Sequence, residues 1–183
     1  VKKYAGHVRD WKSGDPDWDN GRGKAIIGAL NYLASKHVNL IYFLPMNIGG
    51  DGQNVWPFAG TINPAGDPAY DNVHYRLSKL RQWEIVFQHA QSRGIVLHFV
   101  FNEAEQKNKL ELGGKDLTTE RKLFYREMVA RFGHHNGLIW NLCEEYNIGG
   151  LDLGAESVRE FAAYLAQLDP YDHPITVHHA GDA

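Results

Sequence analysis

Four short apolar segments, separated by longer amphipathic stretches, constrain the fold of this chain most strongly. They are β-prone, and the second is too continuously apolar for a sheet with one solvated face. In chain order they are VNLIYFL (38–44), GIVLHFVFN (94–102), GLIWNL (137–142) and PITVHH (174–179). Strands that alternate with helices in this way indicate a parallel sheet covered by helices.

The stretches between these segments have helical periodicity. Gly94 lies where the second stretch ends, as expected of a helix C-terminus, and Asp116 is the predicted N-cap of the third. A stripe from Val158 to Leu168 is ended by Asp169 and Pro170. The predicted helices span residues 23–38, 76–94, 117–132 and the region around 158–168.

The connections differ in length according to the element that they follow. After each predicted helix the connection is short, whereas the loops after the strands are long, at roughly 46–75, 103–116 and 143–153. This asymmetry is typical of a (β/α) barrel, in which the loops after the strands build the active site. An open doubly wound sheet shares the feature, so we keep it as the alternative.

A complete barrel has eight strands and usually about 250 residues. With 183 residues and about four predicted strands, the chain is expected to form a single domain, residues 1–183, that is a partial (β/α)8 TIM barrel. It would supply strands two to five and lack the first strand and strands six to eight. Missing segments or self-association would then cover the open sheet edges.

Composition excludes several classes of protein. Lysines and arginines are scattered among acidic residues and the formal net charge is −3, so no nucleic-acid partner is expected. No apolar run approaches the roughly 20 residues of a membrane helix, and no signal peptide opens the chain. We expect neither a membrane partner nor a cofactor.

The stretch LIWNLCEEYN (138–147) carries the main functional signal, because an apolar strand leads directly into Glu144 and Glu145. Two carboxylates at a strand exit must be solvated, paired or held for use, since burying them unpaired costs several kcal/mol. The structural alternative is one glutamate in solvent and the other in an ion pair.

RFGHHNGLIWNLCEEYN (131–147) resembles the fourth-strand region of clan A glycoside hydrolases. That pattern is an apolar strand, a Trp, two residues, and a polar step ending in Glu. The resemblance implies that Glu145 is the general acid/base. Clan A enzymes commonly have Asn before the acid, where this chain has Glu144.

A closer resemblance is to a bacterial group of clan A-like proteins described as glycosidases, collagen-binding proteins or domains of unknown function. It extends over nearly the whole chain and implies a secreted or periplasmic protein that acts on carbohydrate. The similar segments are residues 7–36, NIGGDGQNVWPF (47–58), LRQWEIVFQHA (80–90), ERKLFYREMVARFGHH (120–135) and WNLCEEYN (140–147).

Retaining glycoside hydrolysis needs two carboxyl groups about 5 Å apart, one protonated and one ionised. A carboxylate at Glu144 would favour the protonated form of Glu145. Adjacent strand residues point to opposite faces, so both reach one site only if the strand breaks or bulges there. In clan A the nucleophile follows the seventh strand, which this chain is not expected to contain.

Further substrate-binding residues are predicted at the other strand exits. Hydroxyl groups of a sugar need polar partners, and its apolar face suits an indole ring. The alternatives are a solvated loop for Asn102 and Glu105 and a loop pinned by a buried indole for Trp56. The predicted residues are Asn47, Asp51, Asn54, Trp56, Asn102, Glu105, Asn141 and His178.

Two other functions remain open. A carbohydrate-binding or scaffolding module would use the same surface without catalysis. A metal-dependent sugar isomerase or hydrolase would use His98, His178 and His179 with the glutamates. We predict no metal site, because a strand histidine is more often packed and hydrogen-bonded, and we interpret His134 and His135 as structural.

Overall fold

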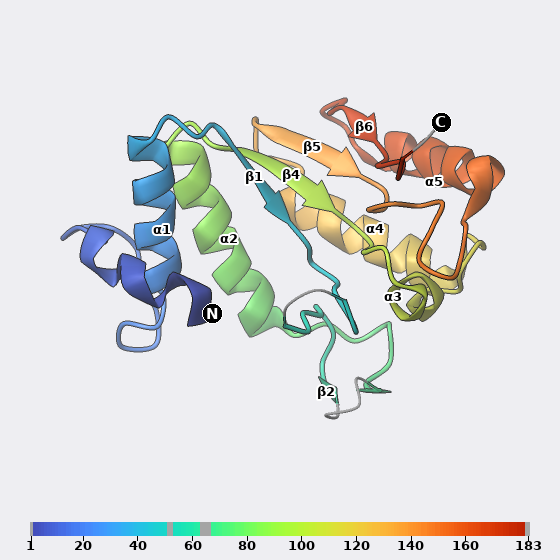
Figure 1. Cartoon of the computed structure of the whole chain (residues 1–183), viewed down its shortest axis with the longest axis horizontal. Helices are drawn as coiled ribbons and strands as arrows, with labels where there is room; N and C mark the ends of the chain where they lie inside the picture. Colours follow the sequence, from blue (N-terminus) through green and yellow to red (C-terminus); the bar gives the residue numbers. More distant parts are fainter. Residues whose placement is uncertain (1, 51–52, 63–66, 182–183) are drawn as a thin grey trace.

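A computed structural model describes residues 2–50, 53–62 and 67–181. Strands β1 (Leu40–Phe43), β4 (Val96–Val100), β5 (Leu138–Asn141) and β6 (Ile175–Thr176) form one parallel sheet in the order β1-β4-β5-β6. The strands lie side by side in chain order, with α1 and α2 beside β1 and α5 beside β6 (Figure 1). This confirms the prediction of four parallel strands that alternate with helices.

The main helices form where the periodicity predicts them. They are α1 (Lys24–Ser35), α2 (Leu77–Ser92), α4 (Thr119–Phe132) and α5 (Gly154–Leu168). Gly94 follows α2 with φ +72°, the left-handed conformation that ends many helices. The predicted cap of α4 is wrong: α4 begins at Thr119, so Thr118 is the N-cap, and its Oγ1 accepts a hydrogen bond from Arg121 N at 3.2 Å.

Small elements that have no clear periodicity were not expected. The 3₁₀ helix η1 (Lys2–Asp10) precedes α1, and the two-stranded ribbon β2 (Thr61–Ile62) and β3 (Pro68–Ala69) lies in the long connection after β1. The short helix α3 (Gln106–Glu111) lies in the connection after β4. In Figure 1 the ribbon and α3 both lie at the end to which the strand arrows point.

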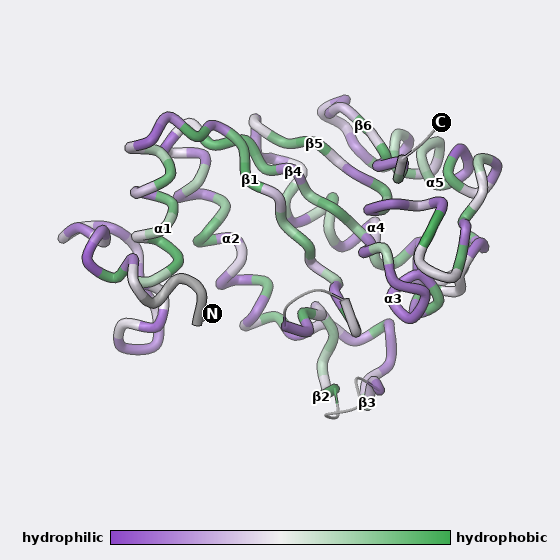
Figure 2. The backbone as a smooth tube through the Cα atoms, viewed as in Figure 1, coloured by the Kyte–Doolittle hydropathy of each residue, from purple (hydrophilic) through white to green (hydrophobic). Residues whose placement is uncertain are grey.

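Helices cover one face of the sheet, and aromatic rings fill the layer between them. The Trp140 ring lies 5.2 Å from that of Phe99 and 5.3 Å from that of Phe101, and Phe87 of α2 lies 6.1 Å from Phe99. Phe87, Phe99, Phe101 and Trp140 are fully buried. In Figure 2 hydrophobic residues are concentrated along β1 and β4, and the chain becomes hydrophilic after β5.

The opposite face of the sheet differs from expectation because it is mixed, with polar side chains among apolar ones such as Val100 and Ile139. Tyr42, His98 and Asn141 occupy this face, alternating along the strands with the residues packed under the helices. Tyr42 is 43% exposed. An inward face of this kind fits one wall of a barrel rather than a sheet covered by helices on both sides.

Strands β1 and β6 are the edges of the sheet. Beside β1 an apolar cavity of about 380 Å³ opens between the sheet and helices α1 and α2, lined in part by Trp18, Ile41, Phe43 and Trp83. Covering segments for these edges remain a prediction. Within the described residues, no helix combines the length and apolarity that spanning a membrane requires.

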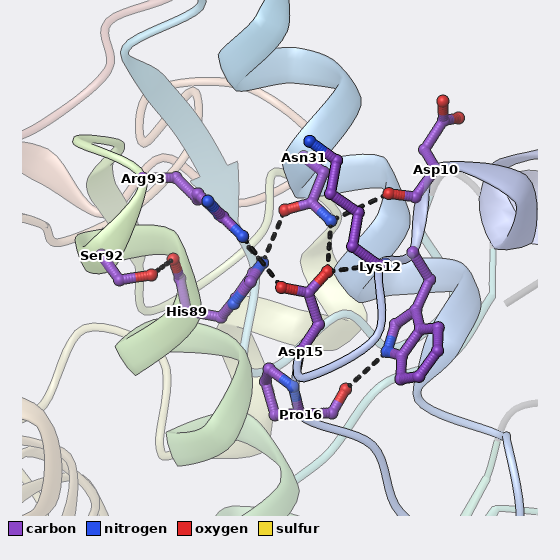
Figure 3. A network of polar contacts seen from close by, with 9 residues as sticks. Asp10, Lys12, Asp15, Pro16, Asn31, His89, Ser92 and Arg93 are labelled. Carbon is purple, nitrogen blue, oxygen red and sulfur yellow. Dashed lines mark hydrogen bonds and ion pairs between the residues drawn. The ribbon is translucent and has the colours of Figure 1, made fainter.

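A polar network fixes the segment before α1 against both α1 and α2 (Figure 3). Asp15 accepts hydrogen bonds from Asn31 Nδ2 at 2.7 Å and Arg93 Nη2 at 2.8 Å. The Asn31 amide oxygen in turn accepts from His89 Nε2 at 2.9 Å. His89 and Asn31 are buried, so this network is sensitive to the protonation of His89.

Acid is expected to destabilise the fold through His89. Burial lowers the pKa of His89, the Arg93 charge adds to this, and Asp15 opposes it. A histidine with a lowered pKa in the folded state binds fewer protons than in the unfolded state, so its contribution is complete above about pH 6.5 and is lost as the pH falls below it. The Tm should fall between pH 7 and pH 5, by about 2–4 °C for each kcal/mol lost.

His89→Gln keeps an N–H donor without a titrating ring, so its Tm should depend less on pH over this range. His37→Asn changes a histidine in an exposed turn at φ +61°, a conformation that Asn tolerates, and should leave the slope unchanged. Parallel Tm curves for His89→Gln and the parent chain would show that His89 does not carry the effect.

Candidate functional site

The connections after β1, β4, β5 and β6 meet at the carboxyl ends of the strands. Glu144 N donates to Asn102 O at 2.8 Å, and Tyr146 N donates to His178 O at 3.0 Å. Gly50 lies against both Asn47 Oδ1 and Glu103 Oε2, where a Cβ atom would collide with them. Backbone bonds and a glycine therefore bring the predicted polar groups of four connections to one end of the sheet.

Glu144 and Glu145 lie beyond the end of the strand, so their side chains need not point to opposite faces of the sheet. Strand β5 ends at Asn141, and Glu145 has φ +42°, in the left-handed region. Its carbonyl accepts a hydrogen bond from Ile148 N at 3.2 Å, which closes a turn. Both glutamates are half-buried. The strand therefore breaks before the two glutamates, as it must if both carboxylates are to serve one site.

The charges of these glutamates reach the polar face of the sheet. Burial raises the pKa of Tyr42, and the negative charges of Glu144 and Glu145 raise it further. Tyr42 lines a cavity of about 350 Å³ together with His98, Asn141, Thr176, Val177 and His178. Within the described part of the chain, the Glu145 carboxylate makes no ion pair. Glu145 is therefore not the ion-paired member of the two glutamates, and its catalytic role stays a prediction.

Cys143 directly precedes the two glutamates and is fully buried. Burial raises the pKa of its thiol to about 12. The thiol is therefore protonated at neutral pH, which does not suit a nucleophile.

Two buried cations lie beneath the site, and sequence reasoning missed both. Arg121 of α4 donates to Asn102 Oδ1 and to Gly114 O, each at 2.9 Å, and its guanidinium lies 4.3 Å from the Phe161 ring. Lys109 of α3 is also fully buried. Both side chains bind mainly backbone carbonyl oxygens, so no spacing of acidic residues in the sequence signals these two buried cations.

The structure corrects the expectation for Asn102. This residue is 1% exposed, its amide oxygen is bound by Arg121, and its backbone carbonyl is bound by Glu144 N. Asn102 therefore joins β4 to α4 and β5 and is not available to a sugar hydroxyl.

Asn141, Asn47 and His178 remain candidate substrate-binding residues, and they differ in how exposed they are. Asn141 lines the polar cavity, but it is 2% exposed, with Nδ2 3.0 Å from His98 Nε2 and Oδ1 accepting from Cys143 N. Asn47 is 5% exposed beside Glu103. His178 is exposed at the rim, and burial together with the His178 charge lowers the pKa of His98.

In the connection after β1, Trp56 is half-buried and packs between Lys79 and Tyr70. Lys79 Nζ lies 4.1 Å from the Trp56 ring centroid and donates to Trp56 O, and the Tyr70 ring stacks parallel to the indole at 6.2 Å. Asn54 Oδ1 accepts from Gly49 N at 2.9 Å and so closes a turn. Asp51 lies outside the described residues.

Glu105 is half-buried at the N-cap of α3, and its backbone N donates to Glu103 Oε2 at 3.2 Å. Glu103 belongs to the same NEAE sequence after the apolar strand and is 5% exposed. It lies at the exit of β4 between Asn47 and Glu105, so the connections after β1 and β4 bring these three residues together.

The predicted alternative of a metal site does not assemble from the expected histidines. Among described residues, no group that includes His98, His178 or His179 brings three ligand atoms together. Glu84, His134 and His135 do, at the opposite end of the strands, where His134 Nε2 and His135 Nε2 lie 3.1 and 3.2 Å from the two Glu84 oxygens. Hydrogen bonding accounts for this group and fits the structural role predicted for both histidines.

Comparison with solved structures identifies the fold. A candidate glycoside hydrolase from Bacteroides vulgatus superposes with a TM-score of 0.67 over 93% of this chain and 34% of that protein, at 13% identity. The chain has a glycoside hydrolase-like fold. A family 5 glycoside hydrolase from the same organism gives a TM-score of 0.63 at 15% identity, over 88% of this chain and 33% of that protein.

The glycoside hydrolase-like fold is also shared with a β-mannanase from the blue mussel Mytilus edulis, with a TM-score of 0.57 and 15% identity over 91% of this chain and 56% of the enzyme. The chain thus spans about a third of the first two structures and about half of the third. No protein-family model and no curated protein sequence matches the chain.

Loss of Arg121 should destabilise the floor of this site. Arg121→Leu leaves Asn102 Oδ1 and Gly114 O buried without their donor, and each unsatisfied acceptor costs about 1–3 kcal/mol. The free energy of unfolding from urea titration should therefore fall by roughly 3 kcal/mol. Arg126→Leu, an exposed change on the same helix, should alter it by less than about 0.5 kcal/mol; equal effects would refute the role assigned to Arg121.

Proposed function

We propose that these residues form part of a retaining glycosidase, with Glu145 as the general acid/base. The observation that carries the proposal is the pair of half-buried carboxylates after β5, beside the cavity lined by Tyr42, His98, Asn141 and His178, in a glycoside hydrolase-like fold. The carboxyl ends of barrel strands are where such enzymes hold their catalytic groups.

In the proposed reaction the Glu145 carboxyl donates its proton to the glycosidic oxygen as the bond from that oxygen to the anomeric carbon breaks. A second carboxylate attacks the anomeric carbon and forms a glycosyl ester. Glu145 then removes a proton from water, which attacks the same carbon and releases the second carboxylate. The second carboxylate is not assigned to a residue of this chain.

The cavity beside Glu145 has the chemistry of a sugar subsite. The exposed Tyr42 ring offers an apolar surface, and His98, Asn141 and His178 offer polar atoms around it. A pyranose combines an apolar C–H face with a rim of hydroxyl groups, so such a mixture suits it. Glu144 is proposed to contact the substrate.

Glu145→Gln tests the catalytic assignment in the longest natural polypeptide that contains these residues. The kcat for a glycoside with a poor leaving group should fall about 10²–10⁴-fold, the contribution typical of a positioned acid or base. Oligosaccharide binding, measured by calorimetry, should be retained because the amide is isosteric. Glu156→Gln, an exposed change in the first turn of α5, is the matched control.

Full activity of Glu145→Gln on the poor leaving group would end the assignment. Oligosaccharide binding without any hydrolysis by the parent polypeptide would instead favour the non-catalytic carbohydrate-binding module.

A further inference from the structure

Lys109 lies fully buried beneath the connection between β5 and α5. It belongs to α3, in the connection after β4, yet its ammonium group binds three carbonyl oxygens of the next connection. Nζ lies 2.8 Å from Glu145 O, 2.5 Å from Ile148 O and 3.1 Å from Leu151 O. One side chain therefore ties together both ends and the middle of the seven residues 145–151.

These bonds use the full donor capacity of the ammonium group, which has three N–H bonds. In the described part of the chain, Lys109 makes no salt bridge with a carboxylate. Burial lowers the pKa of Lys109, while nearby acidic groups, among them Asp152 and Glu145, act in the opposite direction. A buried charge costs several kcal/mol unless dipoles compensate it, and here the carbonyls of the β5–α5 connection do so.

Other hydrogen bonds hold part of this connection, such as the bond from Tyr146 N to His178 O, but its backbone contains strained and glycine-rich positions that Lys109 binds directly. Glu145 has φ +42°, which a residue with a Cβ rarely adopts, and Gly149 and Gly150 follow with φ +76° and +85°. The Glu145 carbonyl is held from two sides, by Ile148 N and by Lys109 Nζ. The orientation of this peptide is linked to the direction of the Glu145 Cα–Cβ bond, so the two hydrogen bonds restrict where the carboxyl group can lie.

We propose that Lys109 is a positioning residue for Glu145, which it holds through the Glu145, Ile148 and Leu151 carbonyls without touching the substrate. This inference rests on the proposed function of Glu145. Misplacing a catalytic group by about 1 Å can cost on the order of 100-fold in rate. Removal of the ammonium should therefore reduce proton donation more than it reduces substrate binding.

Hydrogen exchange on the chain itself tests whether Lys109 holds the connection. In Lys109→Met the amides of residues 144–153 should exchange at least tenfold faster, while those of β4 and β5 exchange as before. Lys79→Met is the control, because Lys79, although only half-buried, is another lysine whose ammonium donates to a carbonyl, that of Trp56, in the connection after β1. It should leave exchange at 144–153 unchanged.

Kinetics in the longest natural polypeptide test whether the positioning matters for the acid. With an alkyl glycoside, whose leaving group needs protonation, kcat of Lys109→Met should fall at least tenfold, with KM changed less than about threefold. With a nitrophenyl glycoside, whose leaving group departs with little help, kcat should fall less than about threefold. A purely structural defect would lower both rates equally, so the ratio of the two rates separates the roles.

Lys109→Gln provides the second variant if Lys109→Met fails to fold. Its amide offers two N–H donors in place of three, so both the exchange at 144–153 and the ratio of the two rates should lie between those of the parent and a full loss. Unchanged exchange, or equal loss on both substrates, would overturn the proposal. Full activity of Glu145→Gln would instead overturn the proposed function, and exchange would still decide whether Lys109 holds the connection.

Discussion

Parallel pairing of β1, β4, β5 and β6 is the constraint on which the rest of the structure depends. Because every strand runs in the same direction, every carboxyl end lies at one edge of the sheet, and the connections that follow must meet there. Residues as distant in sequence as Asn47, Glu103 and Glu144 thus occupy one end of the molecule. Backbone hydrogen bonds between connections, such as the bond from Glu144 N to Asn102 O, fix how these connections pack together.

The two faces of the sheet have separate tasks. Phe99, Phe101 and Trp140 pack under the helices and supply the apolar burial that stabilises the fold. Tyr42, His98 and Asn141 alternate with such residues and line an open polar cavity. The period of two along a strand is what allows one short segment to serve both the core and the candidate site.

Buried cations connect the core to the candidate site. Arg121 of α4 and Lys109 of α3 link these helices to the connections that carry the carboxylates. Both side chains bind mainly oxygen atoms of backbone or amide groups. Such bonds to charged donors are stronger than neutral ones. They give rigidity to connections that contain glycines at positive φ.

The sequence by itself determined the order and type of the main elements, because the periodicity of apolar residues is a local property that burial enforces on each helix and strand. Resemblance to clan A enzymes also predicted Glu145 as the general acid/base; the glycoside hydrolase-like fold agrees with the resemblance, and the role of Glu145 stays a prediction. Chain length and element count were enough to predict that the parallel sheet would be only part of a barrel.

Tertiary structure alone decided which polar residues remain available. Asn102 is bound by Arg121 from 19 positions away, and the Trp56 indole is flanked by Lys79 and Tyr70. No local pattern reveals whether a hydrogen-bonding group is already satisfied, because its partner comes from a distant part of the chain. For the same reason no sequence pattern signals Lys109, whose three acceptors lie 36, 39 and 42 positions further along the chain.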